Sequence, residues 1–458
     1  MGKPYRCRSV PQVQRRPRGI HWAACRKGLP KGSAACYVPP VTCSESRPPS
    51  ALHRHLRGFG IAIFLLTAAA RLAVVFSGVA PYASDAGTYL MPARNLVAGR
   101  GYVDDEGKPY AFRPPTYPLF LAAVFRIAGE SPRAAMVTQA LLAAAGAAGL
   151  AAWVARRHGL GAGAAAGALV ALDPILIPVP AFILTEALGT LLVAGTVMCL
   201  DHGLAARHPG WLLAGGILGG AAALNTPITL LLVPWLLCAA WAVRSPRRPD
   251  WRAMALALAA VVLLVGAWTT RNALVRGDVV VIRDNGFASL VWATTEFDFD
   301  YLPNPYEPGW ADLKRKFDTL SVRPDAHAAF LREAWRNVGA DPLLVLKRVV
   351  KANFWFWVEA PGHHLSGAHR WIRWPTLLFH WLQLLGLVAA LALLRRAGRL
   401  REWTLWLAAI AYFALFLSPL MPIPRYYVPL LPVMDTVIAV CLVGLAARRA
   451  PRRAPVTA

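Results

Sequence analysis

Long apolar runs separated by short polar loops make up most of this 458-residue sequence. Several of the runs approach the roughly 20 residues that a helix needs to cross a bilayer, and ten are predicted as spans, two of them short. The predicted spans are residues 58–80, 134–154, 160–177, 183–200, 211–224, 226–243, 254–270, 377–394, 403–417 and 426–446. Another apolar run, residues 115–128, is too short to span and predicts an interfacial or re-entrant helix. The pattern predicts an all-α polytopic membrane protein with about ten transmembrane helices.

Basic residues gather in alternate loops, on one side of this ten-span arrangement. They lie in the N-terminal segment and at residues 156–158, 244–252, 395–401 and 448–453. Because Lys and Arg concentrate in cytoplasmic loops, both termini are predicted to be cytoplasmic and the protein to be multi-pass in the cell membrane. The extracytoplasmic side then receives the first loop and the longest one.

This topology divides the chain into five parts. They are a basic tail (1–57), an N-terminal bundle (58–271) with a first outer loop (81–130), an outer region of mixed short helices (272–374), C-terminal transmembrane helices (375–447) and a second basic tail (448–458). The N-terminal tail is rich in Arg, Pro and Ser without an apolar period, which predicts disorder. A start codon assigned too far upstream would also explain it.

The composition supports a membrane protein over the other classes. With 56% hydrophobic residues and a mean hydropathy of +0.42, the chain is not a soluble enzyme. The 49 Lys and Arg against 24 Asp and Glu would suit a nucleic-acid binder. Their position in the tail and in alternate loops instead indicates topology and contact with anionic lipids, so no nucleic-acid partner is expected.

Cysteine and histidine predict no metal site. Four of the seven cysteines lie in the N-terminal tail without a CxxC pair, and the other three lie in apolar runs. His363, His364 and His369 have no companion acid or cysteine pattern. We therefore expect no metal and no other cofactor.

Asp85 is the most informative residue of the first outer loop, because it directly follows the first span. A carboxylate at a membrane-facing cavity can act as a general base, since partial burial raises its pKa. Tyr89 would share a helical face with Asp85, and Arg113 and Tyr117 have the same four-residue spacing. A solvated loop with turn residues is the alternative explanation.

Two further ionisable residues lie within or at the end of predicted spans. Arg71 lies inside the first span, where we expect it to pair with an acid, Glu186 or Asp85, rather than to extend towards the membrane surface. Glu186 opens the fourth span from the outside. A role in a site competes there with the simple preference of helix starts for acids.

Arginines also stand at the outer ends of two other spans. Arg271-Asn272 follows the seventh span, and Arg425-Tyr426 opens the last one. Anchoring at the membrane interface is one explanation for both pairs. Together with Arg113, however, these arginines would ring one cavity, and a guanidinium holds phosphate in a fixed geometry.

Several short motifs follow one another at matching membrane depth. They are Arg71-Leu72, SDxxxY at 84–89, GxGY at 99–102, RPPxYPLFLA from Arg113, Thr185-Glu186, WxxRN ending at Asn272, the NG of the long loop and PRYxxPxxP from Pro424. In this order they resemble the bacterial GT-C integral-membrane glycosyltransferases. The nearest groups are the dolichyl-phosphate-mannose protein mannosyltransferase-like and lipid A aminoarabinose transferase-like proteins, over about residues 58–447.

The resemblance implies a hexosyl- or pentosyltransferase with a polyprenyl-phosphate sugar donor and a glycan, lipid or protein acceptor. It implies Asp85 as the base that assists the acceptor. It assigns donor binding to Arg113, Arg271, Arg425, Tyr89 and Tyr117, and supporting roles to Glu186, Arg71, Asn272 and Tyr426. Many relatives carry two consecutive acids where this chain has Asp85-Ala86, which argues against a metal-assisted variant.

The expected chemistry is a single displacement that inverts the sugar carbon. Its transition state resembles an oxocarbenium ion, so the protein must supply a base for the attacking hydroxyl and cations for the departing phosphate. The competing class is a non-catalytic flippase or exporter of lipid-linked glycans. Such a carrier would share the bundle and the arginines but would not need the acid, and the internal repeats of transporters are not evident here.

Overall fold

The structure, a computed structural model, describes residues 49–78, 85–243, 251–277, 279–283, 288–295, 310–321, 323, 326–359, 370–417 and 424–449. The predicted tail over residues 1–48 and the three histidines at 363, 364 and 369 lie outside these residues. Within them the regular structure is helical, and the sole β pairing is a single bridge between Val103 and Pro109.

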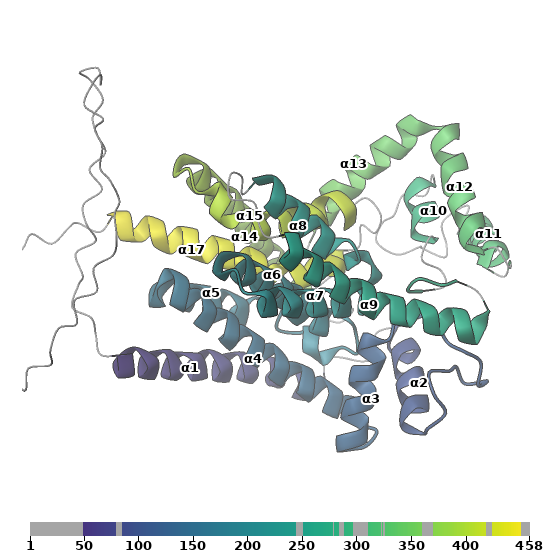
Figure 1. The fold of residues 1–458 in the computed structure, drawn as a ribbon, viewed down its shortest axis with the longest axis horizontal. Coiled ribbons are helices and arrows are strands. Elements are labelled where there is room, and N and C mark those ends of the chain that lie inside the picture. The colour runs from purple at the N-terminus through teal and green to yellow at the C-terminus, as the bar shows by residue number, and fades with distance from the viewer. Residues whose placement is uncertain are drawn as a thin grey trace, which may run out of the picture. The chain divides into compact units, whose positions relative to one another are not determined.

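The helices follow one another along the chain (Figure 1). They are α1 (Pro49–Phe76), α2 (Ala86–Val97), α3 (Thr116–Ala128), α4 (Pro132–His158), α5 (Leu160–Leu172), α6 (Glu186–Ala206), α7 (Pro209–Ala223), α8 (Leu232–Val243), α9 (Trp251–Arg276), α10 (Ala288–Thr294), α11 (Trp310–Ser321), α12 (Ala326–Ala340), α13 (Pro342–Val358), α14 (Arg370–Arg396), α15 (Thr404–Tyr412) and α17 (Leu431–Arg449). Tighter or wider turns are η1 (Val179–Ala181), η2 (Pro227–Thr229), η4 (Leu400–Trp403), η5 (Phe413–Leu417) and η6 (Pro424–Leu430).

The all-α membrane fold is confirmed, but the count of ten spans is not. Among the described residues, 7 helical segments are long and apolar enough to cross a membrane: Arg57–Phe76, Pro132–His158, Glu186–Ala206, Trp251–Arg276, Trp374–Arg396, Leu400–Leu417 and Arg425–Gly444. The other three predicted spans hold the shorter helices α5, α7 and α8. The first helix starts at Pro49, before the predicted residue 58, and the short run at 115–128 forms α3.

Helix boundaries follow local sequence signals. Ser131 caps α4 by accepting a hydrogen bond from the backbone N–H of Ala134 at 3.2 Å, and Pro132 fills the first turn, where no N–H is needed. Gly159, with φ of 93°, ends the helix because only glycine adopts this conformation without strain. The chain can therefore turn directly into α5.

Small residues let the helices approach closely. A methyl group on Gly216 of α7 would lie 2.3 Å from the carbonyl oxygen of Ala257 in α9, and one on Gly163 of α5 would lie 2.6 Å from that of Ala151 in α4. In lipid, helices associate through such close packing, because burial from water drives little association there. In this way α7 is held between α6 and α9, and α5 between α4 and α17.

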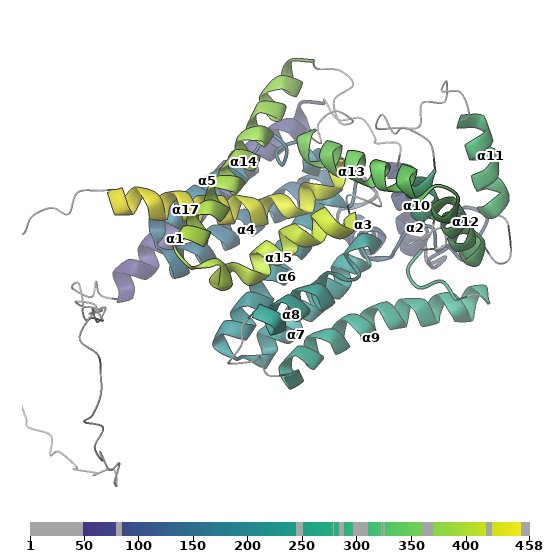
Figure 2. The ribbon, with the colours of Figure 1, turned by 90° about the horizontal axis from the view of Figure 1, so that it is seen from above.

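The two ends of the bundle differ in their contacts. The helices α2, α3, α10, α11 and α12 lie towards the same end in both views (Figure 2). At the other end of α4 and α6, Arg157 pairs with Asp201, and His158 stacks on Trp403 with ring centroids 5.3 Å apart. The predicted basic loop at 156–158 thus lies beside the start of α15, next to the loop at 395–401. The side of the membrane on which they lie stays a prediction.

The α7–α9 contact gives a direct test of this packing. Gly216→Ala places a methyl group against backbone atoms that cannot move aside, so we expect a loss of roughly 1–3 kcal/mol in unfolding free energy. Thermal unfolding of the purified protein in detergent measures it. The matched control is Gly266→Ala on α9, where an added methyl meets nothing within 4 Å. Equal midpoints for the two variants would contradict the close contact.

Candidate functional site

Asp85 lies at the start of α2 and contacts two arginines from distant parts of the chain. One carboxylate oxygen, Oδ1, is 2.8 Å from Nη2 of Arg113, and the other, Oδ2, is 2.7 Å from Nη2 of Arg425. The exposed fractions of these three side chains are 26%, 11% and 20%. The group is thus mostly shielded yet accessible to a ligand, and the structure brings together three residues that the sequence singled out.

Glu186 adds a second acid to this group. It begins α6, and its Oε1 lies 3.5 Å from Nε of Arg425. That Nε is buried and has no hydrogen-bond partner in the part of the chain that the structure describes. The start of α6 is held by Asn225, whose Nδ2 donates to the carbonyl of Thr185 at 3.0 Å. We call Asp85, Glu186, Arg113 and Arg425 the arginine–carboxylate cluster; its formal charges balance.

Two side chains of α2 support Arg113. Its Nε donates to Oγ1 of Thr88 at 2.9 Å, and its guanidinium lies 4.5 Å from the centroid of the Tyr89 ring. Tyr89 in turn meets Tyr117 edge to face, with centroids 5.2 Å apart. The two predicted tyrosines therefore form a packed aromatic layer beneath the arginine. Sequence reasoning missed Thr88, because an exposed-looking Thr carries no signal of its own.

Gln139 is a second residue that sequence reasoning missed. It is buried in α4, accepts from the hydroxyl of Tyr117 at 2.5 Å, and donates to the carbonyls of Pro180 and Phe182 at 2.9 and 3.0 Å. It ties α3 to the segment that leads into Glu186. The signal that could have found it is an amide inside an apolar run, since a buried amide in a membrane bundle needs partners.

Electrostatics favour the ionised form of Asp85. Burial by itself raises the pKa of this carboxyl, but Arg113 and Arg425 outweigh burial and hold the pKa below its usual 3.8. Burial raises the pKa of Tyr89 well above its ordinary value, so its phenol stays neutral. Asp85 is thus a carboxylate at neutral pH, with both of its oxygens held by guanidinium groups.

Arg271 and Asn272 lie apart from the arginine–carboxylate cluster. The Arg271 guanidinium donates to the backbone carbonyls of Tyr102 and Tyr110 at 2.6 and 2.9 Å, and Asn272 donates to the carbonyl of Val280 at 3.0 Å. The Tyr102 hydroxyl donates to the carbonyl of Arg113 at 2.8 Å. Arg271 therefore clamps the loop that holds Arg113 in place. Its contact with a donor phosphate stays a prediction.

The predicted pairing of Arg71 with Glu186 or Asp85 is wrong. Arg71 is 2% exposed, and its guanidinium donates to the carbonyls of Val170 and Ala171 at 3.1 and 3.4 Å, with no ion pair to either acid among the described residues. The last carbonyls of a helix have no hydrogen-bond donor within the helix, and Arg71 is the donor for two of them at the end of α5.

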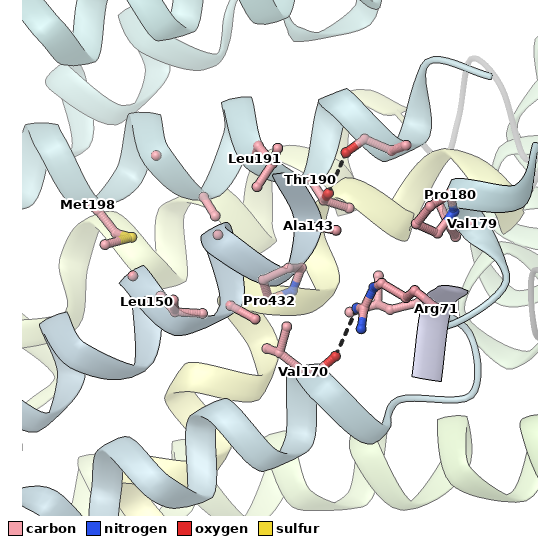
Figure 3. Close-up of a pocket in the computed structure, with 17 residues that line it drawn as sticks. Arg71, Ala143, Leu150, Val170, Val179, Pro180, Thr190, Leu191, Met198 and Pro432 are labelled. Atoms are coloured by element: carbon pink, nitrogen blue, oxygen red, sulfur yellow. Dashed lines mark hydrogen bonds between the residues drawn. The ribbon is translucent and has the colours of Figure 1, made fainter. Parts of the chain in front are cut away.

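Arg71 also closes one end of an apolar cavity. The cavity has a volume of about 220 Å³ and lies between α4 and α6, lined by Leu150, Leu191 and Met198 among others (Figure 3).

Tyr426 lies beside the arginine–carboxylate cluster, its ring centroid 5.2 Å from the Arg425 guanidinium. The described residues hold no group of three acid, His or Cys side chains that could bind a metal.

Comparisons with known proteins give a family match for part of the chain and similar folds for most of it. Residues 112–269, which include Arg113, Tyr117 and Glu186, match the profile of the dolichyl-phosphate-mannose-protein mannosyltransferase family. The fold is similar to that of the Archaeoglobus fulgidus oligosaccharyltransferase, crystallised with Zn and sulfate, with a TM-score of 0.50 and 15% identity over 85% of this chain and 49% of that chain. The family match covers about a third of the chain, and the similarity to the oligosaccharyltransferase is one of fold.

A second solved structure is more distant. ArnT from Cupriavidus metallidurans, crystallised with undecaprenyl phosphate, gives a TM-score of 0.41 and 14% identity, over 87% of this chain and 79% of that one. No curated protein matches the chain in sequence. The chain spans about half the length of the archaeal oligosaccharyltransferase.

The lowered pKa of Asp85 predicts how the ion pairs respond to pH. Because the folded pKa lies below the unfolded value, the pairs contribute stability above 3.8 that is lost as the pH falls through the folded pKa. We expect the parent to melt above Asp85→Asn by a constant margin from about pH 7 to 5, and this margin to disappear at lower pH. Thermal unfolding in detergent measures it, and Asp105→Asn in the same loop is the control. A margin that grows on acidification would contradict the ion pairs.

Proposed function

We propose that this protein is a GT-C glycosyltransferase that transfers a sugar from a polyprenyl-phosphate donor to a hydroxyl acceptor on the extracytoplasmic face of the membrane. The observation that carries the proposal is the position of Asp85 between Arg113 and Arg425. A base and two phosphate-binding groups within one partly accessible cluster are what such a transfer requires. The match of residues 112–269 to a dolichyl-phosphate-mannose family supports the same donor class.

The two arginines suit the departing phosphate. A guanidinium can bind two phosphate oxygens at once, and its charge does not depend on pH. The Arg113 guanidinium stacks on the Tyr89 ring and donates to Thr88, so its orientation is fixed before a ligand binds. Arg425 is held between two acids. Groups arranged in advance lower the barrier, because they need not reorganise as charge develops.

The same arginines regulate the base. While both hold Asp85, its lowered pKa makes it a poor proton acceptor. A donor phosphate competes for the two guanidiniums, and each contact transferred to the phosphate removes a cause of the lowered pKa. Asp85 then gains basicity when the donor is in place. Donor binding and base activation are thus one event in this arrangement.

The reaction is a single displacement. The acceptor oxygen forms a bond to the anomeric carbon while its proton passes to the carboxylate of Asp85. The bond between that carbon and the phosphate oxygen breaks, and the electron pair leaves with the phosphate, stabilised by Arg113 and Arg425. Attack from the face opposite the leaving group inverts the anomeric carbon, through an oxocarbenium-like transition state.

Asp85→Asn tests the base. The amide keeps the size and hydrogen bonding of the carboxylate but removes the basic oxygen, so turnover should fall by about 10²–10⁴-fold while donor binding persists. Transfer in purified enzyme and donor binding are measured separately. Asp105→Asn, an exposed acid of the same loop, should keep the parental rate. Near-parental transfer by Asp85→Asn would remove this residue from the mechanism and make Glu186 the next candidate.

Arg113→Lys and Arg425→Lys test the phosphate contacts. Lysine keeps the charge but loses the two-pronged geometry, at a loss of about 1.5–3 kcal/mol for a charged hydrogen bond, which is roughly ten- to hundredfold in Kd. Binding of a polyprenyl monophosphate in detergent is the measurement, and Arg100→Lys, an exposed arginine nearby, is the control. Arg271→Lys distinguishes the observed loop clamp from the predicted phosphate contact. Loss of the clamp makes residues 102–110 easier to cleave by protease, whereas loss of a phosphate contact lowers the affinity for the polyprenyl monophosphate. Unchanged affinity in the first two variants would reduce both arginines to structural ion pairs.

A further inference from the structure

A second polar group lies deep in the helix bundle. Gln383 of α14 donates from Nε2 to Oδ2 of Asp173, at the end of α5, and to Oδ1 of Asp435 of α17, both at 2.9 Å. Asp173 and Asp435 are fully buried, and Gln383 is 4% exposed. Carboxyl groups at such positions in a membrane bundle are rare and mark a function or a specific partner. The proposed reaction uses none of these three.

The charges of this group are unequal between its two acids. Arg71 interacts electrostatically with Asp173, whose Oδ1 also accepts from the N–H of Ile175 at 2.7 Å. Oδ2 of Asp435 is buried and has no hydrogen-bond partner in the described part of the chain. One guanidinium balances one carboxylate, and two neighbouring carboxylates away from water do not both stay ionised. Asp173 accepts from both Ile175 and Gln383, and Asp435 accepts from Gln383, and hydrogen bonds to a carboxylate favour its ionised form. We therefore assign the negative charge to Asp173 and the proton to Asp435.

The polar face of α14 continues from Gln383 to the segment that carries Arg425. His380, one turn before Gln383, contacts the carbonyl of Trp357 through Nε2 at 2.7 Å and stacks on Tyr427 with centroids 5.0 Å apart. The Tyr427 hydroxyl donates to the carbonyl of Glu359 at 3.0 Å. Tyr427 belongs to η6, which also carries Arg425 and runs directly into α17. The positions of α14 and α17 therefore determine the position of Arg425.

We propose that Arg71, Asp173, Gln383 and Asp435 form a positioning network that places Arg425 against Asp85. Arg71 lies on α1, which leads to Asp85. Asp173 ends the helix that leads to Glu186, and Asp435 lies on α17, which directly follows η6. Because no water replaces a lost hydrogen bond inside a membrane bundle, these contacts fix how the helices lie against one another. The role in catalysis rests on the proposed function, but the placement does not.

The test is the coupling between Asp85 and Arg425, measured without activity. A double-mutant cycle of Asp85→Asn and Arg425→Met, followed by thermal unfolding in detergent, gives that coupling. We expect it to be lost in Gln383→Met and in Asp173→Asn backgrounds, because Arg425 no longer meets Asp85. Thr436→Val is the matched control and should keep the coupling. Thr436 is buried on α17 beside Asp435, and its hydroxyl donates to the carbonyl of Pro432 in the same helix at 2.8 Å. Backgrounds that lower the melting temperature but leave the coupling unchanged would overturn the proposal.

Two further variants test the charge assignment. Asp435→Asn replaces a neutral acid by a neutral amide and should keep the coupling, whereas Asp173→Asn leaves Arg71 without its counter-charge. Removing both charges in Arg71→Met/Asp173→Asn should restore part of the stability lost by either single change. Equal loss of coupling in Asp435→Asn and Asp173→Asn would overturn the assignment.

Binding of a polyprenyl monophosphate to the parent protein separates the two proposals. If the coupling falls in the network variants but the parent does not bind this probe, the positioning network stands and the proposed donor is wrong. If the parent binds the probe but the coupling is unchanged in the Gln383→Met and Asp173→Asn backgrounds, the network proposal is wrong and the proposed donor stands.

Discussion

The contact of one carboxylate with two guanidiniums is the constraint on which this end of the molecule depends. Asp85 and Arg425 are 340 residues apart, and Arg113 comes from a third segment. Charges held away from water are unfavourable unless they are paired in good geometry. The start of α2, the loop before α3 and the turn η6 must therefore meet accurately, and much of the surrounding structure serves to make them do so.

The supporting contacts form a chain of backbone clamps. Arg271 holds the carbonyl of Tyr102, and the hydroxyl of Tyr102 holds the carbonyl of Arg113. The N–H of Thr116, at the start of α3, donates to the carbonyl of Leu224 at the end of α7 at 3.1 Å. The first and the last of these contacts join the first loop to α9 and to the end of α7, and the second lies within the loop. A loop fixed in this way can present charged side chains with the accuracy that transition-state stabilisation needs.

The arginines resolve a conflict within the proposed mechanism. A general base needs a pKa near the working pH, yet two guanidiniums lower the pKa of Asp85. The conflict disappears when the same guanidiniums bind the donor phosphate. Their positive charge then pairs with the phosphate, and it no longer lowers the pKa of Asp85. In such a site, an acceptor hydroxyl meets an active base only after the donor is bound.

The sequence by itself determined that this is an all-α membrane protein, and it singled out the four residues of the arginine–carboxylate cluster. Apolar runs of membrane length predict helices, because a bilayer leaves no other way to satisfy the backbone. Asp85, Arg113, Glu186 and Arg425 stood out because ionisable residues at span ends are unusual. Only the tertiary structure decided which of them meet, that Arg71 serves the end of α5 and that Arg271 clamps a loop. It also revealed Gln139 and Gln383. Partners far apart in the chain leave no local pattern, since their contact depends on how whole helices pack, and a lone amide in an apolar run does not name its partner.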